Sequence, residues 1–292
     1  MKMNEPVAAA QRLTLPSVMN ALTVDVEDYF QVSALASNIP RDTWNSIPCR
    51  VERNVDALLG IFDDHKVSAT FFTLGWIAER YPELVRRIVG QGHELASHGF
   101  NHLRATDQSP AEFLTDITSA RKLLQDISGG EVIGYRAPSF SISRQNPWAF
   151  DCLRTAGYRY SSSVYPVVHD HYGIPDAPRF PYLTRDGLME IPITTLRIFG
   201  RNIPAGGGGY FRLAPYGLSR WAINRFNSQE QRPAIFYMHP WEIDPDQPRV
   251  PGVSLKTRFR HYVNLGRTRA RLIRLLGDFS WGRVDQAYSI ES

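Results

Sequence analysis

The sequence predicts an α/β fold, a single (β/α) barrel in which helices cover a mostly parallel sheet. The first observation is that short apolar strands and helical patterns alternate at least five times along the chain. Such alternation is typical of parallel sheets with covering helices. The second observation is size, because 292 residues, of which 43% are hydrophobic, suffice for one large core. We therefore expect one barrel domain rather than two.

The expected strands share apolar, β-branched or aromatic residues and are bounded by polar or turn residues. They are 21–26, 67–74, 94–97, 132–135, 158–164, 188–193 and 234–238. The expected helices show apolar residues at helical spacing or a capping signal at their start. They are 51–65, 77–91, a helix from 109 onwards, 147–155 and 215–226. In the third of these, Ser109 is the expected N-cap, Pro110 the first helical residue and Glu112 the partner in a capping box.

Three segments are expected: a disordered tail over 1–18, the barrel over 19–250, and a basic helical extension over 251–292 packed on the barrel. The cations of the extension are Lys256, Arg258, Arg260, Arg267, Arg269, Arg271 and Arg274. We interpret them as the solvated face of a final helix, with attachment to an anionic inner membrane leaflet as the alternative. The glycine run 206–209 is interpreted as a plain loop, with a lid or a close approach to a glycan as alternatives.

Composition excludes several classes of protein. The net charge of +4 is only mildly basic and no recognition motif accompanies it, so no nucleic-acid partner is expected. Cys49 and Cys152 match no metal or disulfide framework, which suits a reducing compartment. We identify no apolar stretch near 18 residues and no secretory signal, so we expect a cytoplasmic protein.

Chemically capable residues follow four of the expected strands. The first strand ends in Asp25, Glu27 and Asp28, and other strands are followed by His98, Arg136 and His239. The C-terminal ends of parallel strands meet at one edge of a barrel, where its active site lies. These side chains are therefore expected to lie close together.

His98 and His102 are four residues apart, so both imidazoles can face one point. With a carboxylate they make a competent site for a divalent metal, whereas alone they are compatible with ordinary polar histidines of a loop. Asp25 and Glu27 share one face of an extended strand, and Asp28 faces the other side unless the chain has turned. One carboxylate could bind the metal while another takes a proton from water.

Arg136 can clamp a carboxylate with two hydrogen bonds, and a salt bridge at the rim is the alternative. His239 is a candidate general acid, although a lone histidine at a strand end is more often structural. Trp241 could stack on a sugar face or cover the rim of the barrel.

The motifs TVDVED (23–28), HGFNH (98–102), RAPSF (136–140) and YMH (237–239) resemble, in order, those of the NodB-homology polysaccharide deacetylases, carbohydrate esterase family four. The resemblance implies a distorted (β/α) barrel and one divalent metal ion, zinc by preference. It implies that Asp25 is the catalytic base, Arg136 the residue that orients it, and His239 the catalytic acid. His98 and His102 match the metal ligands, and Glu27 or Asp28 would be the third, because Val26 separates the acids that adjoin in the family.

Further features of the resemblance concern the substrate. Trp241, Phe140 and Tyr165 are the expected substrate contacts. Gly99 replaces the family's usual Ser or Thr, and the fourth family motif is not recognisable around 160–165. The C-terminal stretches resemble a subgroup encoded with exosortase (PEP-CTERM) exopolysaccharide systems. The implied partner is an N-acetylated glycan, with contact to the inner membrane or an assembly complex. The alternatives are a metal-free amidohydrolase of a small ureide and a carbohydrate-binding pseudoenzyme.

Overall fold

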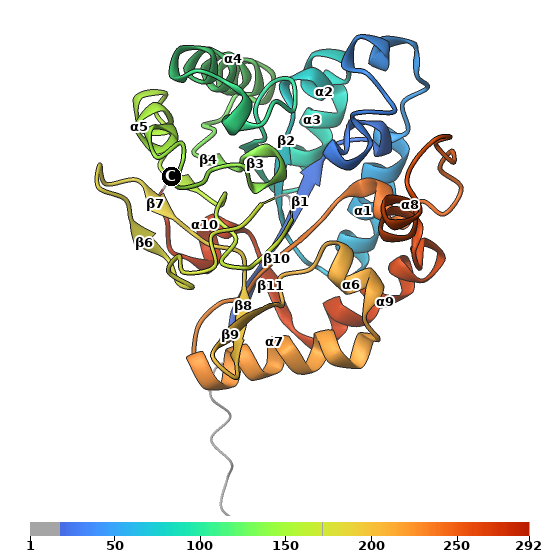
Figure 1. The fold of residues 1–292 in the computed structure, drawn as a ribbon, viewed down its shortest axis with the longest axis vertical. Coiled ribbons are helices and arrows are strands. Elements are labelled where there is room, and N and C mark those ends of the chain that lie inside the picture. Colours follow the sequence, from blue (N-terminus) through green and yellow to red (C-terminus); the bar gives the residue numbers. More distant parts are fainter. Residues whose placement is uncertain (1–17, 171, 292) are drawn as a thin grey trace, which may run out of the picture.

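The computed structural model describes residues 18–170 and 172–291, so nearly all of the expected tail 1–18 lies outside the described residues. One curled sheet runs through the middle of the molecule, with helices on its outside (Figure 1). Its strands are β1 (Met19–Val26), β2 (Thr70–Thr73), β3 (Glu94–Ser97), β4 (Gly134–Tyr135), β5 (Tyr160–Ser161), β6 (Tyr182–Leu183), β7 (Met189–Glu190), β10 (Ile235–Met238) and β11 (Ser280–Gly282). The predicted α/β fold is confirmed.

The order of the strands is β10-β1-β2-β3-β4-β5-β7-β6, and β11 pairs with β1 off this path. All pairs are parallel except β6 with β7. The C-terminal ends of β1, β2, β3, β4 and β10 therefore open on one side. This is the side on which the sequence places its acids and histidines.

Ten helices are described: α1 (Val51–Asp64), α2 (Gly75–Arg80), α3 (Pro82–Gly90), α4 (Pro110–Ser128), α5 (Trp148–Thr155), α6 (Gly209–Leu213), α7 (Tyr216–Glu230), α8 (Leu255–Tyr262), α9 (Leu265–Asp278) and α10 (Val284–Ala287). The capping box predicted between Ser109 and Glu112 is confirmed at the start of α4. The single helix predicted over 77–91 was wrong. Pro82 begins a new helix there, because a proline has no N–H to continue the preceding one.

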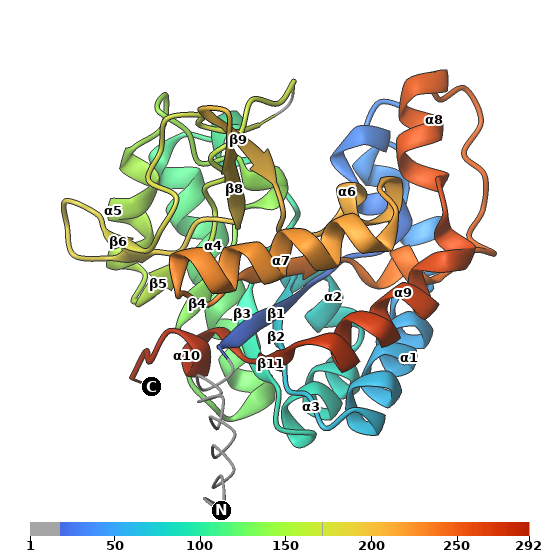
Figure 2. The same ribbon diagram turned by 90° about the horizontal axis from the view of Figure 1, so that it is seen from below.

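Alternation along β1 sorts its side chains between two cores. Leu22, Val24 and Val26 pack outward against α1, α7 and α9, which cover this side of the sheet (Figure 2). Ala21 belongs instead to the cluster inside the curled sheet. Asp25 has the same parity as Ala21, so it points inward. A fully buried, two-sided strand thus delivers one carboxylate to the interior.

The glycine run 206–209 closes the gap beside β10. Gly208 N–H donates to the carbonyl of Tyr237 (2.8 Å), and Tyr237 N–H donates to the carbonyl of Gly206 (2.7 Å). Gly207 has φ +103°, and a Cβ there would lie 2.3 Å from the Tyr237 carbonyl oxygen. The run is more than the plain loop that was expected, because Gly207 forms a bridge with Tyr237 of β10 and Gly209 begins α6. The hairpin of β8 (Thr195–Ile198) and β9 (Arg201–Pro204) leads into this run.

The C-terminal region does more than pack on the barrel. β11 pairs with Met19–Ala21 of β1, and Val284 N–H donates to the Thr70 hydroxyl of β2 (2.8 Å). Leu272 and Leu275 of α9 join the core that covers β1. Residues 251–291 therefore complete the sheet as well as cover it. Among the described residues, no helix is both long and apolar enough to cross a membrane.

Candidate active site

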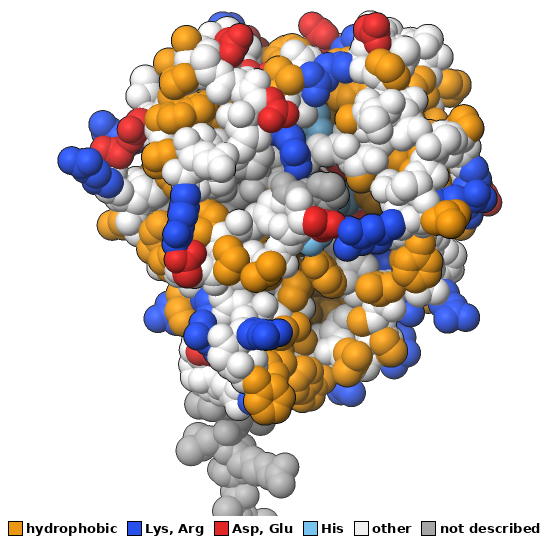
Figure 3. Space-filling model, in the orientation of Figure 1, with side chains coloured by type: hydrophobic (Ala, Val, Ile, Leu, Met, Phe, Trp, Pro, Cys, Tyr) orange, Lys and Arg blue, Asp and Glu red, His pale blue; other side chains and the backbone are white. Residues whose placement is uncertain are grey.

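The residues that follow the strands meet in one cavity of about 680 Å³. Its lining includes Asp25, Glu27, His98, His102 and His239. The space-filling view looks into a central hollow in which histidine atoms are visible, with Lys and Arg side chains around it (Figure 3). Residues more than 200 positions apart in the sequence thus share one pocket, as the shared edge of the sheet predicts.

Arg136 holds Asp25. Its Nη1 donates to Asp25 Oδ1 (2.6 Å) and to the Thr23 hydroxyl (2.8 Å), while Nε and Nη2 donate to Ser162. The guanidinium also lies 4.1 Å from the centroid of the Phe72 ring. Arg136 is fully buried, so the alternative of a salt bridge at the rim is wrong. These contacts fix one oxygen of Asp25 and leave Oδ2 as the oxygen nearer to His239 (4.0 Å).

Glu27, His98 and His102 form a group that could hold a metal ion. One ligand atom from each lies within 4.8 Å of the others, and all three side chains are buried. His98 Nδ1 is 2.8 Å from the carbonyl oxygen of Arg136. A proton on Nδ1 satisfies that contact and leaves the Nε2 lone pair free to bind a metal.

The electrostatics of this group fit a metal site. Burial, followed by the charge of His102, holds the pKa of His98 well below its usual value, so its imidazole is neutral. Burial raises the pKa of Glu27, but the charge of His102 and its hydrogen bond to Glu27 outweigh burial and lower that pKa to about 2. A neutral imidazole and an ionised carboxylate are the forms that bind divalent metals.

Asp28 has a different task. Its Oδ1 accepts from Tyr29 N–H (2.7 Å), while Oδ2 accepts from the Cys49 thiol (3.0 Å) and from Arg50 N–H. It is the N-cap of the short helical turn Tyr29–Gln31. Glu27 N–H donates to the carbonyl of Asp25 (3.0 Å). The turn that this hydrogen bond closes directs the Glu27 side chain into the cavity. Of the two candidate ligands, the geometry therefore brings Glu27 to the histidines.

Asp116 of α4 supports the histidine loop and was missed from the sequence. Its carboxylate accepts from Phe100 N–H (2.9 Å) and Asn101 N–H (3.4 Å). Gly99 has φ +76°, and a Cβ there would lie 2.9 Å from Asp116 Oδ2. This close approach explains why glycine replaces Ser or Thr at this position. Asp116 lies on a helix 14 residues beyond His102, so no local motif identifies it.

His239 occupies the opposite wall. Its Nε2 is 3.5 Å from Glu27 Oε1, and its Nδ1 is 2.7 Å from Glu242 Oε1. Burial lowers the pKa of His239, but the hydrogen bond to Glu242 and the charges of Glu27, Glu242 and Asp25 outweigh burial and raise it to about 9. Glu242 in turn pairs with Arg212 (2.6 Å). The sequence analysis missed both residues. Glu242 had a weak signal, an acid three residues after the histidine, whereas Arg212 had none.

Of the three expected substrate contacts, two border the cavity and one does not. Phe140 lines the cavity. Trp241 also borders it, but its ring is buried between His239 (5.2 Å between centroids) and His261 (4.4 Å), so it presents no exposed platform for a sugar face. Tyr165 is fully buried and is not among the lining residues, because it packs behind Phe140. The expectation of substrate contact was wrong for Tyr165.

Comparisons with known proteins identify similar sequences and a similar fold. Residues 42–161 match the family model of the polysaccharide deacetylases, and residues 162–289 match a model described as a domain of unknown function. Over 102 residues the chain is 31% identical to a peptidoglycan-N-acetylglucosamine deacetylase of Bacillus cereus. Over 90 residues it is 37% identical to a chitooligosaccharide deacetylase of Azorhizobium caulinodans.

The two alignments cover 35% and 30% of this chain, and 46% and 43% of the relatives, so the chain spans less than half the length of the curated relatives it matches. The chain superimposes on a solved structure from Mycobacterium smegmatis with a TM-score of 0.59 at 19% identity. That protein is described as a polysaccharide deacetylase without a demonstrated activity. That superposition covers 95% of this chain and 92% of the other. It shows a likeness of fold.

The matched region and the site overlap in part. His98, His102 and Arg136 lie within 42–161, whereas Asp25 precedes that segment and His239 follows it. The strands that bring these outlying residues to the cavity belong to the same curled sheet. Residues 42–161 are therefore similar to the polysaccharide deacetylases, and the site combines residues from within and outside that segment.

Proposed function

We propose that the protein is a metal-dependent hydrolase that removes N-acetyl groups from an amino-sugar-containing glycan. The observation that carries the proposal is the grouping of Glu27, His98 and His102 beside two further buried groups, Asp25 and His239. Names of the relatives support the substrate class, because one acts on peptidoglycan N-acetylglucosamine and another on chitooligosaccharides.

The three ligand side chains fit a divalent metal by their chemistry, since two imidazoles and one carboxylate are a donor set suited to zinc. Such an ion supplies polarisation of an amide carbonyl and acidification of a water molecule. The carbonyl of Arg136 accepts a hydrogen bond from His98 Nδ1 and so orients the His98 ring.

The chain itself supplies the proton transfers. Asp25, held through Oδ1 by Arg136, accepts a proton from the attacking water. His239 donates a proton from Nε2 to the departing amine, which would otherwise leave as a poor anion. Asp25 Oδ2 and His239 Nε2 lie 4.0 Å apart and both residues line the cavity, so one acetamido group bound in the cavity can contact both. The products are acetate and a free amino sugar.

The experiment compares metal content and acetate release from N-acetylglucosamine oligomers. We expect bound zinc and acetate release in the wild type, and loss of both in His98→Ala/His102→Ala. Asp25→Asn should keep the metal and lose turnover, because an amide cannot take the proton. His65→Ala, at the end of α1, is the control for loss of a histidine elsewhere.

Two results would contradict the proposal or one of its residue assignments. A metal-free wild type without acetate release would overturn the proposal in favour of a ureide amidohydrolase or a pseudoenzyme. Retained turnover in Asp25→Asn would remove Asp25 as the base.

The finer proposal concerns setting and substrate. The resemblance of the C-terminal stretches supports a bacterial exopolysaccharide, or its precursor, as the substrate. Leu255 and Phe259 of α8 are exposed between the cations Lys256, Arg258 and Arg260, which supports peripheral contact with the anionic inner leaflet from the cytoplasmic side. Co-sedimentation with phosphatidylglycerol vesicles that is lost at high salt is the expected result. Indifference to both lipid and salt would contradict it.

A further inference from the structure

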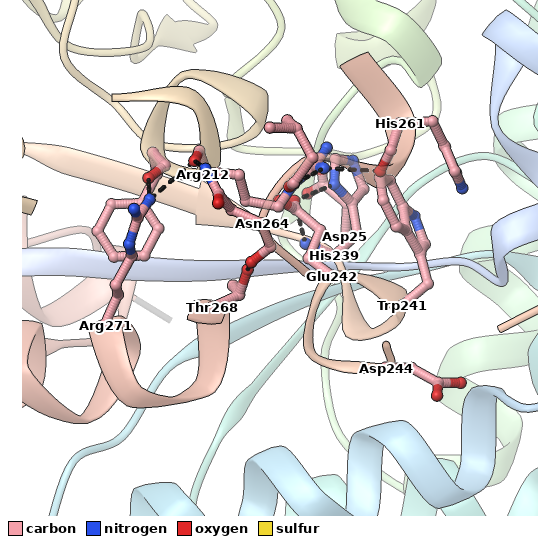
Figure 4. A network of polar contacts seen from close by, with 12 residues as sticks. Asp25, Arg212, His239, Trp241, Glu242, Asp244, His261, Asn264, Thr268 and Arg271 are labelled. Carbon is pink, nitrogen blue, oxygen red and sulfur yellow. Dashed lines mark hydrogen bonds and ion pairs between the residues drawn. The ribbon is translucent and has the colours of Figure 1, made fainter. Parts of the chain in front are cut away.

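A buried ion pair lies next to His239 (Figure 4). Arg212 Nε lies 2.6 Å from Glu242 Oε2, and both side chains are almost fully buried. The other oxygen, Oε1, contacts His239 twice, at Nδ1 (2.7 Å) and at the backbone N–H (3.1 Å). Each oxygen of one carboxylate therefore has its own partner, an arginine on one side and the histidine on the other.

Arg212 is itself held by the C-terminal region. Its Nη1 donates to the carbonyl of His261 (2.7 Å) and to that of Val263 (3.3 Å), at the junction of α8 and α9. Its own carbonyl accepts from Asn264 Nδ2 and Arg271 Nη1, both at 2.8 Å. With contacts at both ends, the guanidinium has one orientation. Residues outside the region that matches the deacetylase family thus determine where Glu242 lies.

The contact with Glu242 determines which nitrogen of the His239 ring faces the cavity. Because Nδ1 is committed to Glu242, Nε2 is the nitrogen that faces Asp25 and Glu27. Trp241 stacks on the ring at 19° between planes, which restricts its tilt. The side chain of His239 keeps 19% exposure, whereas that of Glu242 keeps 1%. Arg212 and His239 both border the cavity, whereas Glu242 does not. Of the three, His239 is the proton donor of the proposed reaction.

A buried ion pair is poor evidence for stability, because the desolvation of both partners offsets their attraction. A function in orientation explains why Glu242 Oε1, the oxygen that Arg212 does not bind, contacts the histidine. We propose that Arg212 and Glu242 are positioning residues for proton transfer, which aim His239 Nε2 at the leaving nitrogen. Through them, residues 162–289 complete the active site rather than form a separate functional unit. The inference rests on the proposed deacetylation.

Water adds to the acetyl carbonyl carbon and gives a proton to Asp25; the carbon–nitrogen bond breaks, and the nitrogen takes the proton of His239 Nε2. His239 is then neutral and keeps its Nδ1 contact with Glu242. Only the second proton transfer depends on the aim of His239. A substrate whose leaving group departs without protonation should therefore be insensitive to the pair.

The test compares two substrates, penta-N-acetylchitopentaose and 4-nitrophenyl acetate, which share the acetyl group and differ in the leaving group. Glu242→Gln keeps the shape of the side chain and removes its charge, and Arg212→Gln removes the anchor. We expect each to lower kcat for the amide by roughly 10²–10³-fold with little change in KM. Hydrolysis of the ester should change by less than about threefold. Arg212→Lys should restore part of the amide activity.

The controls distinguish a misoriented His239 side chain from a protein that fails to fold. Arg179→Gln breaks another partly buried Arg–Glu pair of the same region, with Glu230 (3.0 Å), away from the cavity, and should leave both substrates unaffected. Melting temperature and metal content identify a variant that fails to fold, and the isosteric Glu242→Gln then carries the test. His98→Ala/His102→Ala must abolish ester cleavage, which shows that the ester uses this site.

Equal loss on amide and ester, or loss on neither, would overturn the inference while leaving deacetylation intact. A wild type that cleaves the ester but no N-acetyl amide would overturn the proposed function, and the inference with it. Amide-selective loss in both variants would support it.

Discussion

At the scale of single residues, the partners of a buried side chain decide which role it has. Asp25, Glu27 and Asp28 look interchangeable in the sequence, yet one is held by Arg136, one lies beside two histidines and one caps a helical turn. The sequence could predict the residue types of the site, because strand ends meet at one edge. It could not separate Glu27 from Asp28, since that depends on a turn whose geometry spacing does not reveal.

The different tasks of Glu27 and Asp28 can be separated by substitution. Glu27→Gln should lose bound zinc on dialysis at unchanged melting temperature, because it removes the charged ligand and keeps the volume. Asp28→Ala should retain zinc and lose about 1–2 kcal/mol of stability, since it removes an N-cap and two further hydrogen bonds. Metal analysis and thermal denaturation of the two variants check this. Loss of zinc from Asp28→Ala alone would reverse the assignment.

At the scale of elements, local signals predicted the existence of helices and strands better than their lengths. The predicted strand 158–164 is observed only as Tyr160–Ser161, because Ser162–Val164 turn to meet Arg136 and Glu190. The capping box of α4 is local and was predicted in full. The role of the glycine run was not, because it depends on a strand some 30 residues away.

The glycine run can be tested with a matched pair of substitutions. Gly207→Ala should destabilise the protein by more than about 2 kcal/mol, because it combines a positive φ with a Cβ close to the Tyr237 carbonyl. Gly217→Ala lies in α7 with open space around it, so it should be neutral or stabilising by up to about 1 kcal/mol. Denaturant unfolding measures both. Equal effects would mean that the run does not depend on glycine.

At the scale of the whole molecule, the described chain is one interdependent unit. The carboxyl edge of the sheet carries the cavity, and the other end carries Glu94, where β2, β3, β5 and the C-terminal segment meet. Glu94 accepts from the hydroxyls of Thr70 (2.5 Å) and Tyr160 (2.7 Å) and from Asp285 N–H (3.3 Å). No sequence pattern indicated this junction, because its members come from four separate segments.

Glu94 should make stability depend on pH. Burial, followed by the charge of Asp285, raises its pKa to about 7 from an ordinary value of 4.5. The folded protein keeps this proton up to about pH 7 while the unfolded chain loses it from about pH 4.5, so stability falls across that window by at most about 3 kcal/mol. Glu94→Gln should therefore gain melting temperature relative to the wild type between pH 5 and pH 8. A difference between the two proteins that stays constant with pH would exclude Glu94 as the cause.

The pairing of β11 with β1 also has a consequence for the newly made chain. β1 obtains its neighbours β10 and β11 only after residues 235–238 and 280–282 have been synthesised. Until then β1 has an unpaired edge and Asp25 lacks His239 beside it, so the proposed site is incomplete and the edge is exposed to edge-to-edge association. Closure across such long sequence separations is slow. Completion of the proposed site should therefore wait for residues 280–282, which contain no metal ligand and no proton donor proposed for the reaction.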